Sequence, residues 1–460
     1  MSTSDFSTLN LAPELLSTLQ ELNYQQMTPI QQQSLPAILA GQDVIAQAQT
    51  GSGKTAAFAL GMLSALNVKR FRIQGLVLCP TRELAEQVAN ELRTLGRSIH
   101  NIKVLTLCGG VPSRHQTLSL EHGAHFIVGT PGRVLDHLQQ QRLDLSELSM
   151  LVLDEADRML EMGFQDDVAT IAAAMPSQRQ TLLFSATYPA KIEQLAASLM
   201  REPIRVSVAA SPAQNQIEQQ FFALAGGSRE QAVMLLLQQF QPASCVVFCN
   251  TKRVTQQLAD ALQQQGFSAM ALHGDLEQKD RDQTLLQFAN KSARILVATD
   301  VAARGLDISE LDLVINAELA HDTDTHTHRI GRTGRAGAKG QAFTLIDDGK
   351  DDYKLSLLQD DVSNTIQLQS LPAQSLLDKT PAKAEMVTIQ IQGGKKQKLR
   401  PGDIVGALTR DQQVAFEDVG KIQLHDLWAY VAVKRSAAKK ALQILNHDKM
   451  KGRSFRAWQL

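Results

Sequence analysis

A lysine and a threonine stand at the end of a run of small residues, where a buried strand gives way to a helical pattern. The run is AQTGSGKT, and it ends in Lys54 and Thr55. Small residues let the backbone curl so that its N–H groups face an anion at the helix N-terminus. The lysine then reaches the β- and γ-phosphates of a nucleotide, and the threonine hydroxyl ligates Mg²⁺. The predicted phosphate loop comprises Ala48, Gln49, Thr50, Gly51, Ser52, Gly53, Lys54 and Thr55.

Acidic residues follow a second buried run. Asp154, Glu155 and Asp157 come directly after the apolar residues MLVL. The carboxyl end of a strand is where an α/β sheet presents its ligand site. There, Asp154 can hold Mg²⁺, and Glu155 can orient and deprotonate the water that attacks a phosphate. A solvated helix start is the alternative, but such a start does not usually follow four apolar residues.

The elements that position these residues form two series of strands and helices. In the first, from residue 44 to about 208, helical stretches separate the buried runs DVIAQA, GLVLCP, KVLTLCGG, HFIVGTP, MLVLDEAD and TLLFSAT. The second series contains CVVFCN, SAMALHGD, ARILVATD, DLVINAE and GQAFTLI. Continuous apolar strands separated by helices are typical of a parallel sheet covered on both faces. The predicted fold class is therefore α/β, with a polar hinge at 208–218 between two lobes.

The C-terminal part of the chain has a different pattern. The predicted strands are MVTIQIQ, VGKIQLH, WAYVAVK and SFRAWQL, and the predicted helices are PGDIVGALTRD and AAKKALQILNHD. The resulting order, βαββαβ, defines a small α+β sandwich. We therefore divide the chain into a first lobe at 1–208, a second lobe at 209–370, a linker at 371–383 and a small domain at 384–460.

Charge is distributed unevenly along the chain, although the total is only −1. Residues 379–460 contain 16 lysines and arginines against 7 acidic residues, a balance of +9. The preceding residues contain the other 30 basic and 40 acidic residues, a balance of −10. A basic module attached to an acidic core indicates that the module binds a polyanion, although a merely soluble charged domain is the alternative.

Composition excludes several classes of protein. With 460 residues, of which 43% are hydrophobic and 20% charged, the chain is typical of a globular protein with two or three domains. Its apolar stretches are too short to span a bilayer, and the N-terminal residues do not resemble a signal peptide. We therefore expect a cytoplasmic monomer without a membrane partner. Buried, reduced thiols are expected at Cys79, Cys108, Cys245 and Cys249.

Further motifs occur in the order known from one family. The first lobe carries AQTGSGKT, PTRELA, TPGR, DEAD and SAT, and the second carries VVFCNTK, TDVAARGLD and HRIGRTGRAG. This set resembles the DEAD-box RNA helicases over roughly residues 6–346. The resemblance implies two RecA-like lobes whose cleft binds ATP with Mg²⁺ on one side and RNA across the other. It also implies an RNA helicase whose ATP hydrolysis is stimulated by RNA.

The resemblance also implies roles for individual residues at the nucleotide. In YQQMTPIQ, Gln31 would read the adenine edge and Tyr24 would stack on the ring. Ser185 and Thr187 would couple hydrolysis to the RNA side. The other matches are Phe6 as the family's isolated aromatic residue, Asp307 at the ribose, His328 as a link to the DEAD segment, and Arg332 and Arg335 as arginine fingers.

A second set of matches concerns RNA. The family's RNA-contacting positions correspond to Arg82, Gly110, Thr130, Gly132 and Arg133 in the first lobe and to Thr251, Gln278, Arg281, Thr299 and Gly305 in the second. Glycines and hydroxyl groups at such places suit close approach to sugars and phosphates and do not read bases. Ordinary loop or capping chemistry is the alternative at any one of these positions.

The small domain resembles the C-terminal domain of one ribosome-assembly helicase of this family, in GGKKQKLRPGDIVGALT and WAYVAV. The implied fold is an RNA recognition motif, and the implied partner is a hairpin of large-subunit ribosomal RNA in pre-ribosomal particles. The candidate RNA contacts are Lys395, Lys396, Lys398 and Arg400 for phosphates and Trp428 and Tyr430 for unpaired bases. Packing of the two rings on the C-terminal helix is the alternative.

Three functions fit these features. We favour local unwinding or remodelling of ribosomal RNA during large ribosomal subunit assembly, with the small domain selecting the target. A general helicase of cold response or RNA decay is the second, because related tails share PGDIVGAL-like segments. An ATP-gated RNA clamp is the third, and the intact Glu155, Ser185 and Thr187 argue against it.

Overall fold

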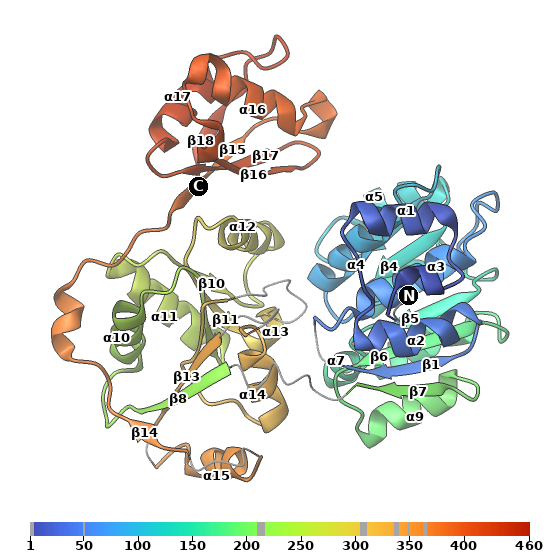
Figure 1. Cartoon of the computed structure of the whole chain (residues 1–460), viewed down its shortest axis with the longest axis horizontal. Helices are drawn as coiled ribbons and strands as arrows, with labels where there is room; N and C mark the ends of the chain where they lie inside the picture. The colour runs from blue at the N-terminus through green and yellow to red at the C-terminus, as the bar shows by residue number, and fades with distance from the viewer. Residues whose placement is uncertain are drawn as a thin grey trace. The chain divides into compact units, whose positions relative to one another are not determined.

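The computed structural model of the chain describes residues 4–48, 51–208, 217–303, 311–334, 340–347, 349–361 and 366–460. The predictions for Gln49, Thr50, Gly305, Asp307 and Arg335, and for most of the hinge at 208–218, lie outside these residues. The chain divides near residue 212 into two compact units. The first unit is one lobe, and the second contains the other lobe together with the C-terminal domain (Figure 1).

The first lobe is built on a parallel sheet with the order β3-β4-β2-β5-β6-β1-β7. Its strands are β1 (Val44–Gln47), β2 (Gly75–Leu78), β3 (Val104–Leu107), β4 (Phe126–Gly129), β5 (Met150–Leu153), β6 (Gln180–Ser185) and β7 (Ile204–Ser207). Its helices are η1 (Phe6–Thr8), α1 (Pro13–Glu21), α2 (Pro29–Leu39), α3 (Lys54–Ala65), α4 (Arg82–Leu95), α5 (Ser113–Glu121), α6 (Pro131–Gln139), α7 (Ala156–Glu161), α8 (Gln165–Ala173) and α9 (Ala190–Leu199).

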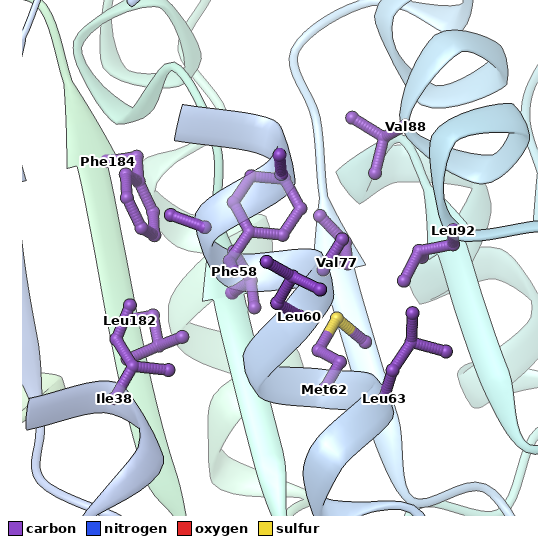
Figure 2. Close-up of a cluster of buried hydrophobic side chains, with 14 of the residues drawn as sticks. Ile38, Phe58, Leu60, Met62, Leu63, Val77, Val88, Leu92, Leu182 and Phe184 are labelled. Atoms are coloured by element: carbon purple, nitrogen blue, oxygen red, sulfur yellow. The ribbon is translucent and has the colours of Figure 1, made fainter. Parts of the chain in front are cut away.

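Two hydrophobic clusters cover the two faces of this sheet. Side chains alternate between the faces of a strand, so Met150 and Val152 of β5 belong to one cluster and Leu151 and Leu153 to the other. Helix α3 supplies much of the first cluster, and its Phe58 ring packs 5.2 Å from another buried phenylalanine ring on β6 (Figure 2). The buried runs in the sequence therefore predicted the strands correctly, and the sheet is covered on both sides.

The second lobe contains a parallel sheet with the order β10-β11-β9-β12-β13-β8-β14. Its strands are β8 (Ile217–Ala223), β9 (Cys245–Cys249), β10 (Ala269–Leu272), β11 (Ile295–Thr299), β12 (Leu313–Asn316), β13 (Gly340–Ile346) and β14 (Leu368–Gln369). Its helices are α10 (Arg229–Phe240), α11 (Lys252–Gln264), α12 (Gln278–Ala289), α13 (Asp300–Ala303), α14 (Thr323–Ile330) and α15 (Asp352–Asp361). The prediction of two RecA-like parallel-sheet lobes is confirmed.

The segment predicted as a linker at 371–383 lies along the second lobe. It contains the 3₁₀ helix η3 (Gln374–Asp378). Leu371 and Leu377 pack against the hydrophobic core of the lobe, and Gln238 Nε2 of α10 donates a 2.7 Å hydrogen bond to the carbonyl oxygen of Lys379. Two apolar side chains therefore tie this otherwise polar segment to the lobe.

The C-terminal domain has the predicted order βαββαβ, with the antiparallel sheet order β16-β17-β15-β18. Its main elements are β15 (Met386–Ile391), α16 (Pro401–Thr409), β16 (Val419–Leu424), β17 (Ala429–Lys434), α17 (Ala438–His447) and β18 (Ala457–Gln459), with 3₁₀ helices η4 (Lys395–Gln397), η5 (Arg410–Gln412) and η6 (Phe416–Asp418). Ala429 and Val431 join the helices in its core, as predicted for alternate residues of this strand.

Two other predictions concern burial and membranes. All four cysteines are buried and none forms a disulfide, as predicted. Burial raises the pKa of the Cys108 thiol to about 12, so this thiol is protonated at neutral pH. None of the helices in the described parts of the chain combines the length and apolar character that a membrane span requires.

Candidate nucleotide and RNA site

The carboxyl ends of three neighbouring strands bring the nucleotide motifs of lobe one together. In the sheet order, β5, β6 and β1 are adjacent. The phosphate loop follows β1, Asp154 follows β5, and Ser185 ends β6 directly beside Gln47 of β1. The phosphate loop is far from the other two motifs in sequence, yet the parallel topology places all three along one edge of the sheet.

The phosphate loop has the backbone shape that its glycines allow. Gly51 and Gly53 have φ values of 84° and 93°, and α3 begins at the next residue, Lys54. A Cβ atom on Gly53 would lie 2.6 Å from Gln31 Nε2, and that nitrogen donates a 3.0 Å hydrogen bond to the Gly53 carbonyl oxygen. Only glycine fits here, because both the positive φ and the approach of Gln31 exclude a side chain.

Two polar groups of the loop suit a polyphosphate. Lys54 is 7% exposed, and its Nζ donates a 2.6 Å hydrogen bond to the Ala48 carbonyl oxygen, which keeps the ammonium group inside the loop. Within the described residues, the buried Ser52 hydroxyl has no hydrogen-bond partner. A buried polar group without a partner is costly, so this donor fits an anion at the N-terminus of α3.

The carboxyl group of Asp154 has an unusual environment. It is 3% exposed, and burial raises its pKa to about 7, while the nearby Lys54 charge opposes that shift. A divalent cation favours the ionised form, and the hydroxyl of Thr55 together with this carboxylate supplies the oxygen atoms that Mg²⁺ prefers. The residues present therefore fit Mg²⁺.

Glu155 has a left-handed backbone conformation with a φ of 50°, directly before α7. Such a conformation is uncommon for a residue with a side chain and costs energy, so it marks functional sites more often than ordinary turns. The backbone N–H of Glu155 donates to Asp154 Oδ1 at 3.1 Å. The turn therefore holds the two acidic residues in fixed relative positions at the end of β5.

Asp157 connects the DEAD segment to the SAT segment, a role that the sequence did not reveal. Its Oδ2 accepts hydrogen bonds from the backbone N–H of Ala186 at 3.1 Å and from the N–H and hydroxyl of Thr187 at 3.0 and 3.1 Å. Ser185 in turn donates to the Thr187 carbonyl oxygen at 2.6 Å. One buried carboxylate thus holds the loop that carries Ser185 and Thr187.

Replacing Asp157 with alanine is expected to uncouple duplex separation from ATP hydrolysis. The substitution leaves buried N–H groups unsatisfied, at about 1–3 kcal/mol each, so lobe one loses stability as well. The measurement is the number of duplexes separated per ATP hydrolysed, together with thermal unfolding. Asp166→Ala, on the exposed surface of α8, is the matched control. An unchanged ratio in the Asp157→Ala protein would contradict the coupling role.

The segment predicted to recognise adenine is organised around Gln31. Its Oε1 accepts a 2.9 Å hydrogen bond from the backbone N–H of Thr28, while Nε2 reaches the phosphate loop. Tyr24 donates to Glu91 Oε1 at 2.8 Å and packs edge-on against Phe6, with ring centroids 6.4 Å apart. Phe6 is 3% exposed and belongs to the core, so it supports the segment from within.

The residues of lobe one that match RNA-contacting positions lie after β2, β3 and β4. Arg82 begins α4, Gly110 has a φ of 74° in the loop after β3, and Thr130 caps α6. Gly132 and Arg133 occupy the first turn of α6. These strand ends are at the same edge of the sheet as the phosphate loop, so RNA and nucleotide would meet one edge of the lobe.

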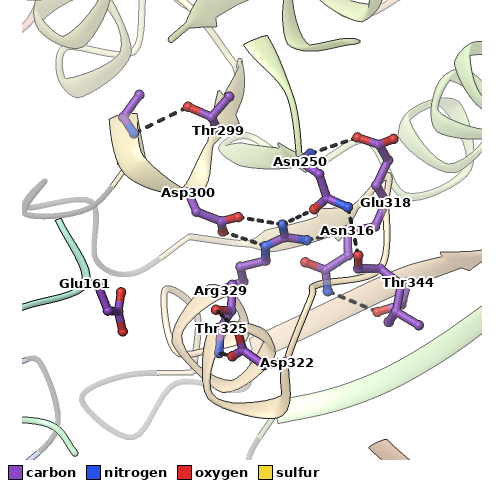
Figure 3. Close-up of polar contacts among 12 residues, drawn as sticks. Glu161, Asn250, Thr299, Asp300, Asn316, Glu318, Asp322, Thr325, Arg329 and Thr344 are labelled. Atoms are coloured by element: carbon purple, nitrogen blue, oxygen red, sulfur yellow. Dashed lines mark hydrogen bonds and ion pairs between the residues drawn. The ribbon is translucent and has the colours of Figure 1, made fainter. Parts of the chain in front are cut away.

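A buried arginine organises the corresponding edge of lobe two. Arg329 is 1% exposed, and its guanidinium forms two 2.7 Å hydrogen bonds with the carboxylate of Asp300. Arg329 also donates to Asn250 Oδ1 and to the Glu318 carbonyl oxygen, each at 2.7 Å (Figure 3). Its guanidinium lies over the Phe248 ring. This network joins α14 to the ends of β9, β11 and β12, and the sequence did not reveal it.

Two candidate RNA residues of lobe two, Thr251 and Thr299, are neighbours in sequence of Asn250 and Asp300 in this network. Thr251 caps α11 and accepts from the N–H of Val254 at 3.3 Å, and Thr299 ends β11. Gln278 and Arg281 are on the first turns of α12. At the C-terminal end of α14, His328 is half-buried and Arg332 is 8% exposed. The Arg329 contacts hold α14, which carries His328 and ends two residues before Arg332.

A rigid loop presents the lysines of the C-terminal domain. Gly394 packs so closely that a Cβ atom there would lie 2.1 Å from the His425 carbonyl oxygen, and Leu399 is buried in the core at 2% exposure. Lys451 Nζ donates to the Lys398 carbonyl oxygen at 2.7 Å. Between these anchors, the exposed basic residues of the loop are Lys395, Lys396, Lys398 and Arg400.

The two candidate stacking rings of this domain are only partly accessible. Tyr430 is 8% exposed, and the half-buried Trp428 packs edge-on against Trp458, with ring centroids 5.7 Å apart.

Within the second unit, the face of the sheet that carries these rings also contacts lobe two. There, Gln283 Nε2 donates to Gln390 Oε1 at 3.2 Å, and a polar cluster of Asn290, Ser292 and Thr388 forms a second contact.

The two parallel sheets and the groups at their carboxyl ends define a RecA-like nucleotide hydrolase. The DEAD/DEAH box helicase family model matches residues 28–195, the helicase conserved C-terminal domain matches 228–337, and the DbpA RNA binding domain matches 388–459. The chain is 51% identical over 452 residues to the ATP-dependent RNA helicase DbpA of Escherichia coli, with 98% of each chain covered.

Two further comparisons agree. The chain is 35% identical over 474 residues to the ATP-dependent RNA helicase DbpA of Bacillus subtilis, with 98% of each covered. A solved structure of S. cerevisiae Dbp5 bound to RNA and ADP BeF3 is 30% identical, with a TM-score of 0.72 over 82% of this chain and 100% of that one. The chain belongs to the DEAD-box ATP-dependent RNA helicases of the DbpA type.

Proposed function

We propose that this helicase remodels ribosomal RNA locally during assembly of the large ribosomal subunit, and that its C-terminal domain selects an RNA hairpin there. The enzyme would act as a cytoplasmic monomer on pre-ribosomal particles, with ATP and Mg²⁺. The support comes from two sides. The relatives that match along 98% of their length share the name DbpA. Residues 379–460 carry a charge of +9, and the residues before them carry a charge of −10.

The observation that carries this proposal is the anchored basic loop. Lys395, Lys396 and Lys398 stand exposed on a segment whose backbone is held at Gly394 and Leu399, and the exposed Arg400 follows directly. The attachment points of these four side chains are therefore fixed before RNA arrives. Cations on an anchored backbone recognise a folded array of phosphates better than cations on a mobile segment, because less backbone freedom is lost on binding. A structured hairpin offers such an array, whereas a flexible single strand does not.

The residue roles of the core follow from the same proposal. Lys54, Thr55 and Asp154 hold the phosphates and Mg²⁺, Glu155 activates water, and Gln31 reads adenine. The arginine fingers, Arg332 and Arg335, neutralise charge on the γ-phosphate. The core reaches sugars and phosphates only, so it does not choose a sequence. Selection therefore falls to the C-terminal domain.

Replacing Lys395, Lys396 and Lys398 together with glutamine is expected to weaken stimulation of ATP hydrolysis by large-subunit ribosomal RNA fragments. Each lost phosphate contact also reduces the salt dependence of RNA binding by up to about one unit of slope. The measurement is ATPase stimulation by these fragments compared with unrelated hairpins of the same length. Each fragment is titrated against both the original and the substituted full chain.

The matched control replaces the exposed Lys439, Lys440 and Lys449 on and after α17, which changes the net charge by the same amount. If both triple variants lose stimulation equally, nonspecific electrostatic attraction explains the RNA binding. Specific recognition of RNA by the basic loop would then be wrong. If the original protein responds equally to every RNA, a general helicase replaces the ribosomal assignment. If RNA stays bound without duplex separation, the chain acts as a clamp.

A further inference from the structure

The side chain of Gln116 is buried where three segments of lobe one meet. It belongs to α5, is 8% exposed and lies outside every motif that the sequence analysis used. Its Nε2 donates a 2.8 Å hydrogen bond to the carbonyl oxygen of Cys108, the residue before the Gly109–Gly110 loop. Its Oε1 accepts from Arg133 Nη1 at 3.1 Å and from His137 Nε2 at 2.9 Å. One amide therefore joins α5, the glycine loop and α6.

The neighbours of this amide settle its orientation. A carbonyl oxygen only accepts and a guanidinium only donates, so Nε2 of Gln116 must face Cys108 and Oε1 must face Arg133. His137 then carries its hydrogen on Nε2. Burial lowers the pKa of His137, and the neighbouring Arg133 lowers it further, so the ring is neutral at pH 7 and can donate in this way. Both lone pairs of Oε1 are used.

The contacts fix one edge of the Arg133 guanidinium. Besides Gln116, Nη1 donates to the carbonyl oxygen of Val111 at 3.2 Å, directly after the glycine loop. Nε lies 3.9 Å from Asp136 Oδ2 in an ion pair. The other terminal nitrogen, Nη2, has no hydrogen-bond partner within the described part of the chain. A planar guanidinium held by one nitrogen presents the other in a fixed direction, which suits a phosphate oxygen.

We propose that Gln116 is a positioning residue for RNA, holding the Arg133 guanidinium and the Gly109–Gly110 loop in the places where lobe one meets the RNA backbone. The inference rests on the proposed RNA contacts of Arg133 and Gly110, and Gln116 itself touches no RNA. Because Arg133 is immobilised in advance, it loses less rotamer freedom when RNA binds. Without the Gln116 amide, Arg133 keeps its charge, but its guanidinium is no longer held in one direction.

Gln116→Met is the direct test, because methionine has a similar length and cannot accept these hydrogen bonds. The full chain is titrated with a single-stranded uridine oligonucleotide at several salt concentrations, alongside Arg133→Met and the double variant. We expect Arg133→Met to reduce the slope of affinity against salt by up to about one unit. Gln116→Met is expected to reduce it similarly, and the double variant no further. In Gln116→Met, the turnover at saturating RNA and the KM for ATP are expected to stay unchanged.

The controls separate this inference from the proposed RNA site. Gln139→Met, on the exposed end of α6, is the matched substitution and is expected to change nothing. If Arg133→Met matters while Gln116→Met keeps the original slope, or if the two effects add, the positioning role is wrong. If Arg133→Met has no effect, its RNA contact is wrong and the role of Gln116 falls with it.

A second variant tests the positioning role of Gln116 if the Gln116→Met protein does not fold. His137→Leu removes the other hydrogen bond to Oε1 while leaving the amide in place. His137→Leu is expected to reduce the slope of RNA affinity against salt less than Gln116→Met does. In a protein that also carries Arg133→Met, it is expected to cause no further reduction. A loss that persists in that background, or an unchanged slope in His137→Leu, would overturn the proposal.

Discussion

Glu155→Gln is expected to abolish steady-state ATP hydrolysis while ATP and RNA remain bound together. The amide keeps the size of the side chain but cannot take a proton from the attacking water. Loss of a general base typically lowers turnover about a hundred- to ten-thousand-fold. The left-handed backbone at Glu155 holds the side chain at the end of β5, and glutamine adopts that backbone at no greater cost. Binding therefore survives the substitution.

Two measurements test this expectation together. Single-turnover hydrolysis reports the chemical step, and the dissociation rate of labelled RNA in the presence of ATP reports the stalled complex. Glu121→Gln, at the exposed end of α5, is the matched control and is expected to behave like the original protein. Near-normal turnover in Glu155→Gln would remove Glu155 from the role of base. Rapid RNA release without turnover would instead show that ATP binding alone does not close the enzyme on RNA.

The fold was predictable wherever strands are buried on both faces. Runs such as MLVL and CVVFC are apolar throughout, because neither face of the strand is exposed to solvent. Each forms a central strand of its sheet. The strands that the sequence analysis missed are β7, β8 and β14, and all lie toward one edge of a sheet. In β7 only one residue is buried, so the apolar run that signals a strand is absent. Pairing with the neighbouring strand, rather than its own composition, makes such a segment extended.

The site was predictable to the extent that function depends on residues adjacent in sequence. The phosphate loop and the DEAD segment each occupy consecutive positions, so residue types and order were sufficient to place both segments at the ends of their strands. The contacts of Gln116, Asp157 and Arg329 join segments that are far apart along the chain. Arg329, for example, bonds to Asn250 across 79 positions. No local pattern specifies such a partner, because the contact exists only after the sheet has brought the strand ends together.

These missed residues share one physical property. Each is a buried polar side chain whose hydrogen-bonding groups are used by two or more segments. A buried polar network that is satisfied rigidifies the structure around it, and one that loses a member leaves costly unpaired groups. The motif residues therefore depend on supporting side chains that carry no motif of their own.

Lys54→Ala is expected to abolish turnover by a different route from Glu155→Gln, because nucleotide binding fails as well. The lysine supplies the one buried cation of the described phosphate loop, and its Nζ is already held at the loop by the Ala48 carbonyl oxygen. Removing a preorganised charge from a phosphate site lowers turnover at least about a hundred-fold. The loss has a second component, because Lys54 also opposes the rise in the pKa of Asp154. Without Lys54 that pKa rises above about 7, so a proton competes with Mg²⁺ at neutral pH.

The two components can be separated by measuring the affinity for ATP at increasing Mg²⁺ concentrations. Lys54→Ala is expected to need more Mg²⁺ than the original protein and to bind ATP weakly even when Mg²⁺ is saturating. Lys69→Ala, with an exposed lysine of the same lobe, is the control and is expected to leave both quantities unchanged. Unaltered ATP affinity in Lys54→Ala would show that the loop binds phosphates through its backbone alone. An unaltered Mg²⁺ requirement would show that Asp154 is ionised without help from the lysine, and that part of the electrostatic account would be wrong.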